Sequence, residues 1–142
     1  MGRIVAIDYG RKRTGIAATD TLRLIASGVA TVPSGELVAY LTDYASREPV
    51  DQFVVGLPKQ MNNQPSENMR YVEAFVNRLR KVLPGIPVTY YDERFTSVLA
   101  HQAMLEGGLG KKRRQDKALV DEISAVIILR DYLESLRNDV NK

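Results

Sequence analysis

Three acidic residues that lie far apart in the chain each stand at the end of a predicted structural element. Asp8 ends an apolar run at residues 4–7. The acidic pair Asp92 and Glu93 directly follows the fifth predicted strand, and Asp121 heads the apolar face of the last predicted helix. A carboxylate in such a place is costly to bury unless it is paired or binds a metal. The structural alternatives are a strand-end turn for Asp8 and a favourable interaction with the helix dipole for Asp121.

The expected convergence of these acids would create a metal site. Strands lie about 4.8 Å apart, so acids on nearby strands and on a helix over the same sheet can share a cation. Oxygen-only ligands suit Mg²⁺ or Mn²⁺, and two such ions can activate a water in phosphodiester cleavage. The chain has no Cys and one His, His101. A thiol nucleophile, a Cys-ligated metal and a multi-His metal site are therefore excluded.

Basic residues are grouped near the three acids in the sequence. The groups follow Asp8, follow Glu93 and precede the helix of Asp121, and the members expected to bind phosphates are Arg13, Arg94, Lys111, Lys112, Arg113 and Arg114. One basic run is usually a solvated surface, whereas three runs beside three acids fit a polyanion held at a metal site. The formal net charge is only +3, so the positive potential must be concentrated there. Nucleic acid is the expected partner.

The elements that must position these residues predict an α/β fold with one domain at residues 1–142. Strands expected at 4–7, 15–19 and 26–32 are closely spaced, which favours an antiparallel meander. Two further strands then alternate with helices, which predicts a five-stranded mixed sheet flanked by helices. These elements are strands at 53–56 and 88–91, and helices at 37–44, 72–83, 98–105 and 119–136.

Two local expectations accompany these elements. Ser34 is expected to cap the first helix. The last helix is apolar almost all round between Ile123 and Leu129, so we expect it to be largely buried.

Neither a membrane span nor a signal peptide is predicted. No apolar run approaches the roughly 18 residues that a span needs. The first residues lead from Ile7 into Asp8 and a basic cluster, not into an apolar signal core. A cytoplasmic location and no membrane partner are therefore expected. No exposed apolar stripe is predicted to mark a dimer face, so a monomer or weak homodimer is expected.

Four groups of residues carry a resemblance to a known family. They are AIDYG with RTGIA at 6–17, VGLP with Met61 at 55–61, DER with Thr96 at 92–96, and VDE with Ala125 and IIL at 120–129. In this order they resemble the YqgF family of ribonuclease-H-like proteins, which are described as Holliday junction resolvases or pre-16S rRNA nucleases. The chain departs from the family pattern at Asn63, Ser97, Ser124 and Arg130, and none of these departures removes an acid.

The resemblance implies a ribonuclease-H-like fold whose catalytic, metal-binding acids are Asp8, Glu93 and Asp121. Asp92 is the neighbour of Glu93, and which of the two is the second ligand stays open. The implied activity is that of a metal-dependent hydrolase, an endonuclease that processes the 5′ end of pre-16S rRNA in ribosome biogenesis.

Three other functions remain open from the sequence. One is a Holliday junction resolvase, which acts on branched DNA. Another is a non-catalytic RNA-binding factor in ribosome assembly. The third is a nucleotide-binding module, because the segment from Asp8 to Gly15 also resembles the first phosphate loop of actin-like ATPases and sugar kinases.

Overall fold

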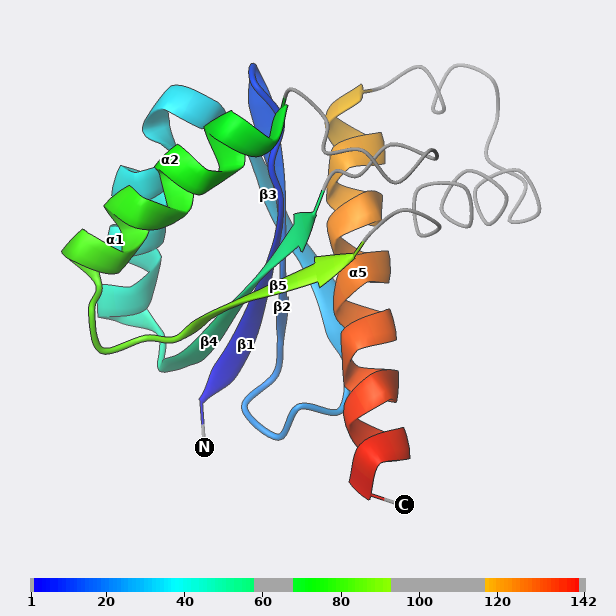
Figure 1. Ribbon diagram of the computed structural model, residues 1–142. Coiled ribbons are helices and arrows are strands. Elements are labelled where there is room, and N and C mark those ends of the chain that lie inside the picture. Colours follow the sequence, from blue (N-terminus) through cyan, green and yellow to red (C-terminus); the bar gives the residue numbers. More distant parts are fainter. Residues whose placement is uncertain (1, 58–67, 93–116, 141–142) are drawn as a thin grey trace.

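The computed structural model describes residues 2–57, 68–92 and 117–140. The described elements are, in chain order, β1 (Arg3–Asp8), β2 (Arg13–Thr19), β3 (Ala26–Pro33), the 3₁₀ helix η1 (Ser34–Glu36), α1 (Leu37–Arg47), β4 (Val50–Leu57), α2 (Asn68–Val82), β5 (Val88–Asp92) and α5 (Lys117–Val140). The strands form one sheet in the order β3-β2-β1-β4-β5 (Figure 1). The helix predicted at 98–105 lies outside the described residues.

The sheet is mixed, as predicted. β1 pairs antiparallel with β2, and β2 antiparallel with β3, which confirms the meander. β4 pairs parallel with β1 and with β5. A parallel pair needs a crossover connection, and α1 provides it between β3 and β4. The carboxyl ends of β1, β4 and β5 therefore point to the same end of the sheet.

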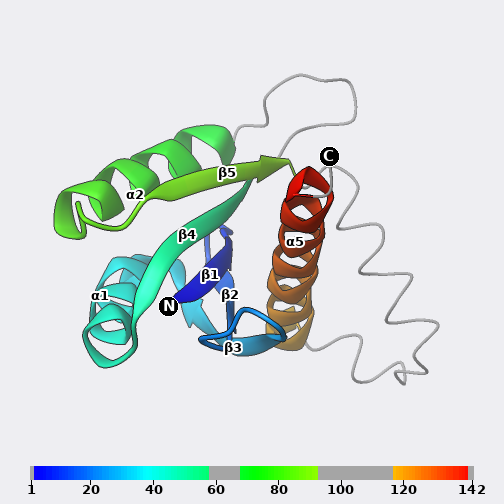
Figure 2. The ribbon, with the colours of Figure 1, turned by 90° about the horizontal axis from the view of Figure 1, so that it is seen from below.

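The two faces of the sheet have separate cores. Figure 2 shows α1 and α2 on one side of the sheet and α5 on the other. Val5 and Ile7 pack with α1 and α2, whereas Ile4 and Ala6 pack under α5. This alternation follows from the two-residue period of a strand. It explains why the β1 sequence is a continuous apolar run, because both of its faces are covered.

Two local expectations are wrong. Ser34 does not cap α1, because the N-cap residue is Glu36 and no side chain caps the helix. Ser34 instead lies in η1, where its hydroxyl makes tertiary contacts. The stretch from Ile123 to Leu129 is also less buried than expected. Ala125, Ile128 and Leu129 are buried, but the other members of the stretch are half-exposed because only one side of α5 meets the sheet.

The loop between β2 and β3 carries an exposed apolar group, although the sequence predicted no such stripe. Leu22, Leu24 and Ile25 are 64%, 63% and 65% exposed. The loop is held by Asp20, whose carboxylate accepts hydrogen bonds from the backbone N–H groups of Leu24 and Ile25. These contacts hold the pKa of Asp20 below its usual value. Among the described residues, no helix has the length and hydropathy required to cross a bilayer.

Candidate active site

Asp8 lies at the end of the central strand of the sheet, on the face covered by α5. It pairs with Gly15 of β2 and is half-buried. Ile4 and Ala6, at even spacing before it, pack in the core under α5. The period of the strand therefore places Asp8 on that face. In open sheets of this type, ligands bind outside the carboxyl ends of the parallel strands, which is the location of Asp8.

Position 121 lies in α5, at helical spacing from residues that face the sheet. This helical stripe continues through Ala125 and Ile128, which are buried against the sheet, to Tyr132. The hydroxyl of Tyr132 lies 2.7 Å from the amide nitrogen of Gln52 in β4. Its ring meets Tyr91 of β5 edge-on at a centroid distance of 6.1 Å. These contacts fix the rotation of α5. The side chain of Asp121 itself lies outside those that the structure describes.

Asp8 and position 121 lie toward the same end of the sheet. Ala6 and Ala125 pack in one core cluster. From Ala6, two strand residues lead to Asp8, an advance of about 6.6 Å. From Ala125, one helical turn leads back to position 121, about 6 Å in the same direction, because α5 runs opposite to β1 (Figure 1). The fold therefore places these two predicted positions toward the same end of the sheet, on the face that α5 covers.

The second predicted acid follows β5, which lies two strands from β1. Tyr90 packs on the α1 and α2 side, and Tyr91 packs under α5. β5 ends at Asp92, which pairs with Leu57 of β4, and the side chain of Asp92 is not among those described. Glu93 lies outside the described residues. The described side chains contain no group of three His, Cys, Asp or Glu residues that could hold a metal ion.

The turn between β1 and β2 carries the first basic group and is tightly tied to η1. A side chain at Gly10 would run into the carbonyl oxygen of Arg13, so the close approach requires glycine. The hydroxyl of Ser34 donates to the carbonyl oxygen of Gly10 and lies 2.8 Å from the hydroxyl of Thr14. The N–H of Ser34 donates to the carbonyl of Lys12 at 3.0 Å. These bonds hold the turn beside Asp8.

Arg13 begins β2 next to this turn, and its phosphate-binding role stays a prediction. The remaining predicted phosphate-binding residues lie outside the described residues: Arg94, Lys111, Lys112, Arg113 and Arg114. His101 lies outside them as well.

Sequence reasoning did not single out Glu122 as a structural contact. Its carboxylate lies directly over Gly28 of β3, so close that even a Cβ at position 28 would collide with it. A glycine in the interior of a strand often marks such a close approach, and that signal was available in the sequence. Glu122 therefore meets the β3 edge, while position 121 lies on the same helical stripe as Ala125.

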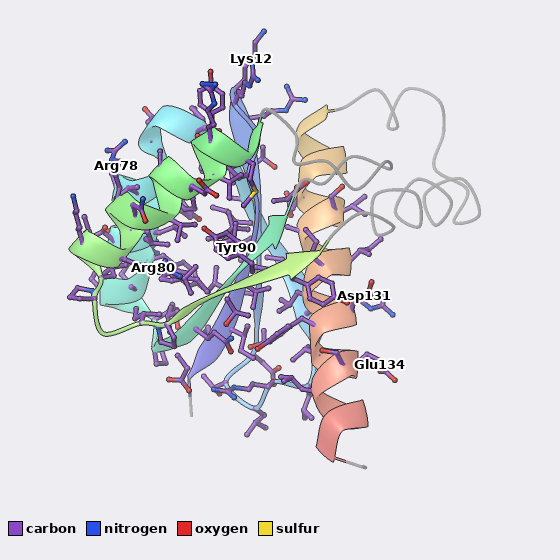
Figure 3. The ribbon with its side chains drawn as sticks, viewed as in Figure 1. Lys12, Arg78, Arg80, Tyr90, Asp131 and Glu134 are labelled. Carbon is purple, nitrogen blue, oxygen red and sulfur yellow. The ribbon has the colours of Figure 1, made fainter. Side chains whose placement is uncertain are left out.

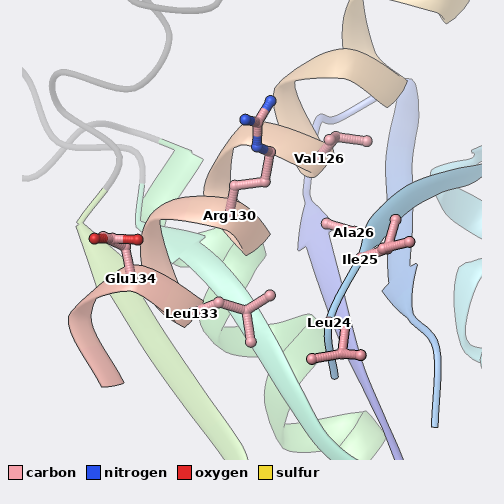
Figure 4. A pocket seen from close by; sticks show the side chains of 7 residues that line it. All are labelled: Leu24, Ile25, Ala26, Val126, Arg130, Leu133 and Glu134. Atoms are coloured by element: carbon pink, nitrogen blue, oxygen red, sulfur yellow. The ribbon is translucent and has the colours of Figure 1, made fainter. Parts of the chain in front are cut away.

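A cavity lies at the opposite end of the sheet from Asp8. It has a volume of about 450 Å³ and is lined by Leu24, Ile25, Ala26, Val126, Arg130, Leu133 and Glu134 (Figure 4). Ala26 pairs with Thr19, near the beginning of β1. Along α5, burial raises the pKa of Asp131. None of these residues is near the carboxyl end of β1, so the cavity is separate from the candidate site.

Comparison with known proteins gives closely similar relatives. Each of the three that follow carries the name "Putative pre-16S rRNA nuclease". The chain is 81% identical to the protein from Parabacteroides distasonis over 135 residues, which cover 95% of this chain and 96% of the relative. It is 65% identical to the protein from Phocaeicola vulgatus, with coverage of 95% and 97%. It is also 65% identical to the protein from Bacteroides thetaiotaomicron, with coverage of 96% and 99%.

Solved structures show the same fold at low sequence identity. T. thermophilus RuvC in complex with a Holliday junction substrate matches with a TM-score of 0.57 and 17% identity, covering 90% of this chain and 92% of that chain. A second Thermus thermophilus RuvC structure matches with a TM-score of 0.50 and 15% identity, covering 89% and 92%. The fold is therefore ribonuclease-H-like, as the sequence resemblance implied.

The family resemblance is confirmed across nearly the whole chain. A family model described as "RuvX: Holliday junction resolvase" matches residues 2–135. This match, together with the identity to relatives of equal length, shows that the chain belongs to the RuvX family, also called YqgF.

Proposed function

We propose that this protein is a metal-dependent endonuclease that hydrolyses phosphodiester bonds in the processing of the 5′ end of pre-16S rRNA. The observation that carries the proposal is the shared location of Asp8 and position 121, on one face and at one end of the sheet. The name of the 81% identical relative supports the RNA substrate. Residues 1–142 would act as one nuclease domain in the cytoplasm, as a monomer or weak homodimer.

Asp8, Glu93 and Asp121 are the proposed catalytic and metal-binding residues. Glu93 is favoured over Asp92 because position 92 of β5 lies two residues after Tyr90, which packs on the α1 and α2 side, and residues at even spacing share a face of a strand. Because β5 lies two strands from β1, about 10 Å across the sheet, the longer Glu side chain also suits the gap.

The three carboxylates provide only oxygen donors, which fit Mg²⁺ or Mn²⁺. When bound, such ions supply activation of the attacking water and stabilisation of the leaving oxygen. The protein's own part is to hold its carboxylates at fixed positions and to orient the scissile phosphate between them. Asp8 is suited to this because a central strand, paired on both sides, carries it.

The proposed phosphate-binding residues are Arg13, Arg94, Lys111, Lys112, Arg113 and Arg114. They would contact the nucleic-acid backbone and thereby set its register without reading bases. Arg13 is supported by its position beside the turn that Ser34 holds next to Asp8.

A second candidate substrate is a four-way DNA junction. The family description names a Holliday junction resolvase, and the RuvC structure with the same fold is a complex with that substrate. Symmetric cleavage of two strands would be expected to need a dimer.

A cleavage assay on both substrates tests the proposal. The full chain is incubated with precursor 16S rRNA and, separately, with a four-way junction, each with Mg²⁺, with Mn²⁺ and with a chelator. We expect metal-dependent cleavage of the rRNA that the Asp8→Asn variant abolishes while RNA binding is retained. Preferential cleavage of the junction would assign the second substrate instead. RNA binding without cleavage, unchanged by the chelator and by Asp8→Asn, would overturn the nuclease and indicate a non-catalytic factor.

A further inference from the structure

A second, smaller cavity lies beside the candidate active site, on the opposite face of the sheet. Its volume is about 230 Å³. Tyr9, Tyr71, Phe75 and Arg78 line it together with η1 and the start of α1. Tyr9 directly follows Asp8, and strand alternation sends consecutive residues to opposite faces. Tyr9 accordingly packs with the core of α1 and α2, whereas Asp8 lies under α5. We call this space the Tyr71 cavity.

Aromatic rings form much of the Tyr71 cavity. Tyr9 stacks on Phe75 of α2 with ring centroids 5.3 Å apart and planes at 18°, and this pair forms a rigid wall. Tyr71 stands one turn before Phe75 and is 47% exposed. An exposed aromatic ring beside an open cavity offers a surface on which the base of a single strand can stack.

Guanidinium groups lie beside these rings. The guanidinium carbon of Arg11 lies 4.6 Å from the centroid of the Tyr71 ring, a cation–π contact that holds the Arg11 side chain beside one wall of the cavity. Arg78 lines the cavity two turns along α2 from Tyr71. Figure 3 shows Lys12 at the β1–β2 turn and Arg78 on α2. No carboxylate is among the lining residues of the cavity.

The size and chemistry of the cavity restrict its occupant. Pockets for drug-sized ligands start at roughly 300 Å³, so this cavity fits one planar base and not a complete nucleotide cofactor. A base can enter such a cavity only if it is unpaired. Recognition of unpaired bases by aromatic rings and guanidinium planes is typical of single-stranded RNA binding.

We propose that the Tyr71 cavity binds one unpaired base of the RNA strand, with Arg11 and Arg78 binding the phosphates on either side of it. This inference rests on the proposed function, because it places the strand across the end of the sheet from Asp8 to Tyr9. The cavity then selects single-stranded over paired RNA a short distance from the scissile bond.

Binding in the absence of cleavage tests the inference. The full chain is titrated into a fluorescently labelled single-stranded RNA oligonucleotide in a chelator, and anisotropy gives the Kd. A blunt-ended RNA duplex of two strands of the same length and a DNA oligonucleotide of the same sequence serve as further probes. We expect Tyr71→Leu to weaken single-strand binding by about tenfold, within the range for base–aromatic stacking, while binding to the duplex changes less than twofold. Tyr71→Phe, which keeps the ring, should bind as the unaltered chain does.

Two variants on α2 distinguish the effect of the cavity on RNA binding from the general effect of positive charge. Arg78→Ala and Arg80→Ala each remove one positive charge from the same helix, but only Arg78 lines the cavity. Arg78→Ala is expected to weaken single-strand binding. It should also reduce the slope of the logarithm of the binding constant against the logarithm of the salt concentration by about 0.7 in magnitude, the value for one phosphate contact on a single strand. Arg80→Ala is expected to stay within twofold. Equal losses in the two variants would overturn the inference.

The remaining outcomes are also decisive. Equal loss of single-strand and duplex binding in Tyr71→Leu would overturn the cavity as a site for unpaired bases. Tighter binding of the DNA oligonucleotide would overturn the assignment to RNA. Failure of the proposed function is a distinct result: the chain would then not cleave RNA with metal present, whatever Tyr71→Leu does to binding.

Discussion

The two ends of the sheet hold similar charged residues in different settings. At the end where β1 begins, acids and bases pair with each other. Arg3 Nε lies 3.2 Å from Glu48, and Arg23 lies 2.6 Å from Asp51, which also accepts the N–H of Gly2 at 2.8 Å. These contacts join the N-terminus, the β2–β3 loop and the start of β4, and their role is structural.

The end where β1 stops has a different arrangement. Asp8 lies there beside a basic turn, an aromatic cavity and the first turns of α5. The carboxyl ends of β1, β4 and β5 point to this end. Residue types alone therefore do not distinguish structure from function. The direction of the parallel strands distinguishes the two ends, because ligands of such sheets bind outside the carboxyl ends of the strands.

The largest expected effect on cleavage comes from comparing the same Asp→Asn substitution at the two ends of the sheet. Asp8→Asn should reduce RNA cleavage by more than the about 10–100-fold typical of losing an outer-shell partner of a metal site. Asp51→Asn, the same chemical change at the other end, should leave the cleavage rate within twofold and lower the thermal midpoint instead. Single-turnover cleavage and thermal unfolding are measured on both variants. A similar loss of cleavage in both would refute the contrast between the ends.

Large-to-small changes in the two cores give the next largest effect. Leu41 is fully buried on the α1 and α2 side, and Leu129 is fully buried under α5. Replacing either by Ala should cost about 2–5 kcal/mol of unfolding free energy, measured by urea denaturation. At urea concentrations well below the midpoint of unfolding, where both variants are folded, only Leu129→Ala should also slow cleavage, because α5 carries Asp121. Slow cleavage in a fully folded Leu41→Ala variant would contradict this distinction.

A smaller effect concerns the pH dependence of the end where β1 begins. The N–H of Gly2 and the guanidinium of Arg23 hold the pKa of Asp51 below its usual 3.8. A lowered folded-state pKa contributes stability that is present above the unfolded value and is lost as the pH falls through the folded one. The thermal midpoint of the unaltered chain should therefore exceed that of Asp51→Asn near neutral pH, and the gap should narrow below about pH 4. A difference in thermal midpoint that does not change with pH would show that the ionisation of Asp51 is not its cause.

The smallest effect is expected on the exposed face of α1. Arg47 Nε lies 2.9 Å from Asp43, and the two side chains are 57% and 65% exposed. An exposed pair at this helical spacing contributes about 0.3–0.5 kcal/mol. Asp43→Asn should accordingly change the unfolding free energy by no more than that, with cleavage unaltered. A larger effect on cleavage would reveal a function at a third location.

Most of the architecture could be predicted from local patterns in the sequence. The strands and the amphipathic helices have periods that depend only on nearby residues, and the structure confirms them where it describes them. The face on which Asp8 lies also follows from strand alternation. Glu93 and the basic residues at 94 and 111–114 stay predictions, because they lie outside the described residues.

Other features depend on contacts between distant segments and could not be predicted locally. The hydroxyl of Ser34 bonds to the β1–β2 turn in preference to α1, although its residue type and position favour a cap. The Tyr71 cavity likewise requires Tyr9, η1 and α2 to meet. In the sequence, Tyr71 and Arg78 are two ordinary residues of an amphipathic helix.

Gly28 has a consequence that extends beyond its own strand. The carboxylate of Glu122 occupies the space that a side chain at position 28 would need, and Glu122 is the neighbour of Asp121. A larger residue at position 28 would have to displace the flexible Glu122 side chain and so change its contact with the edge of the sheet. A glycine in β3 thus keeps room for the residue that adjoins Asp121 in the last helix.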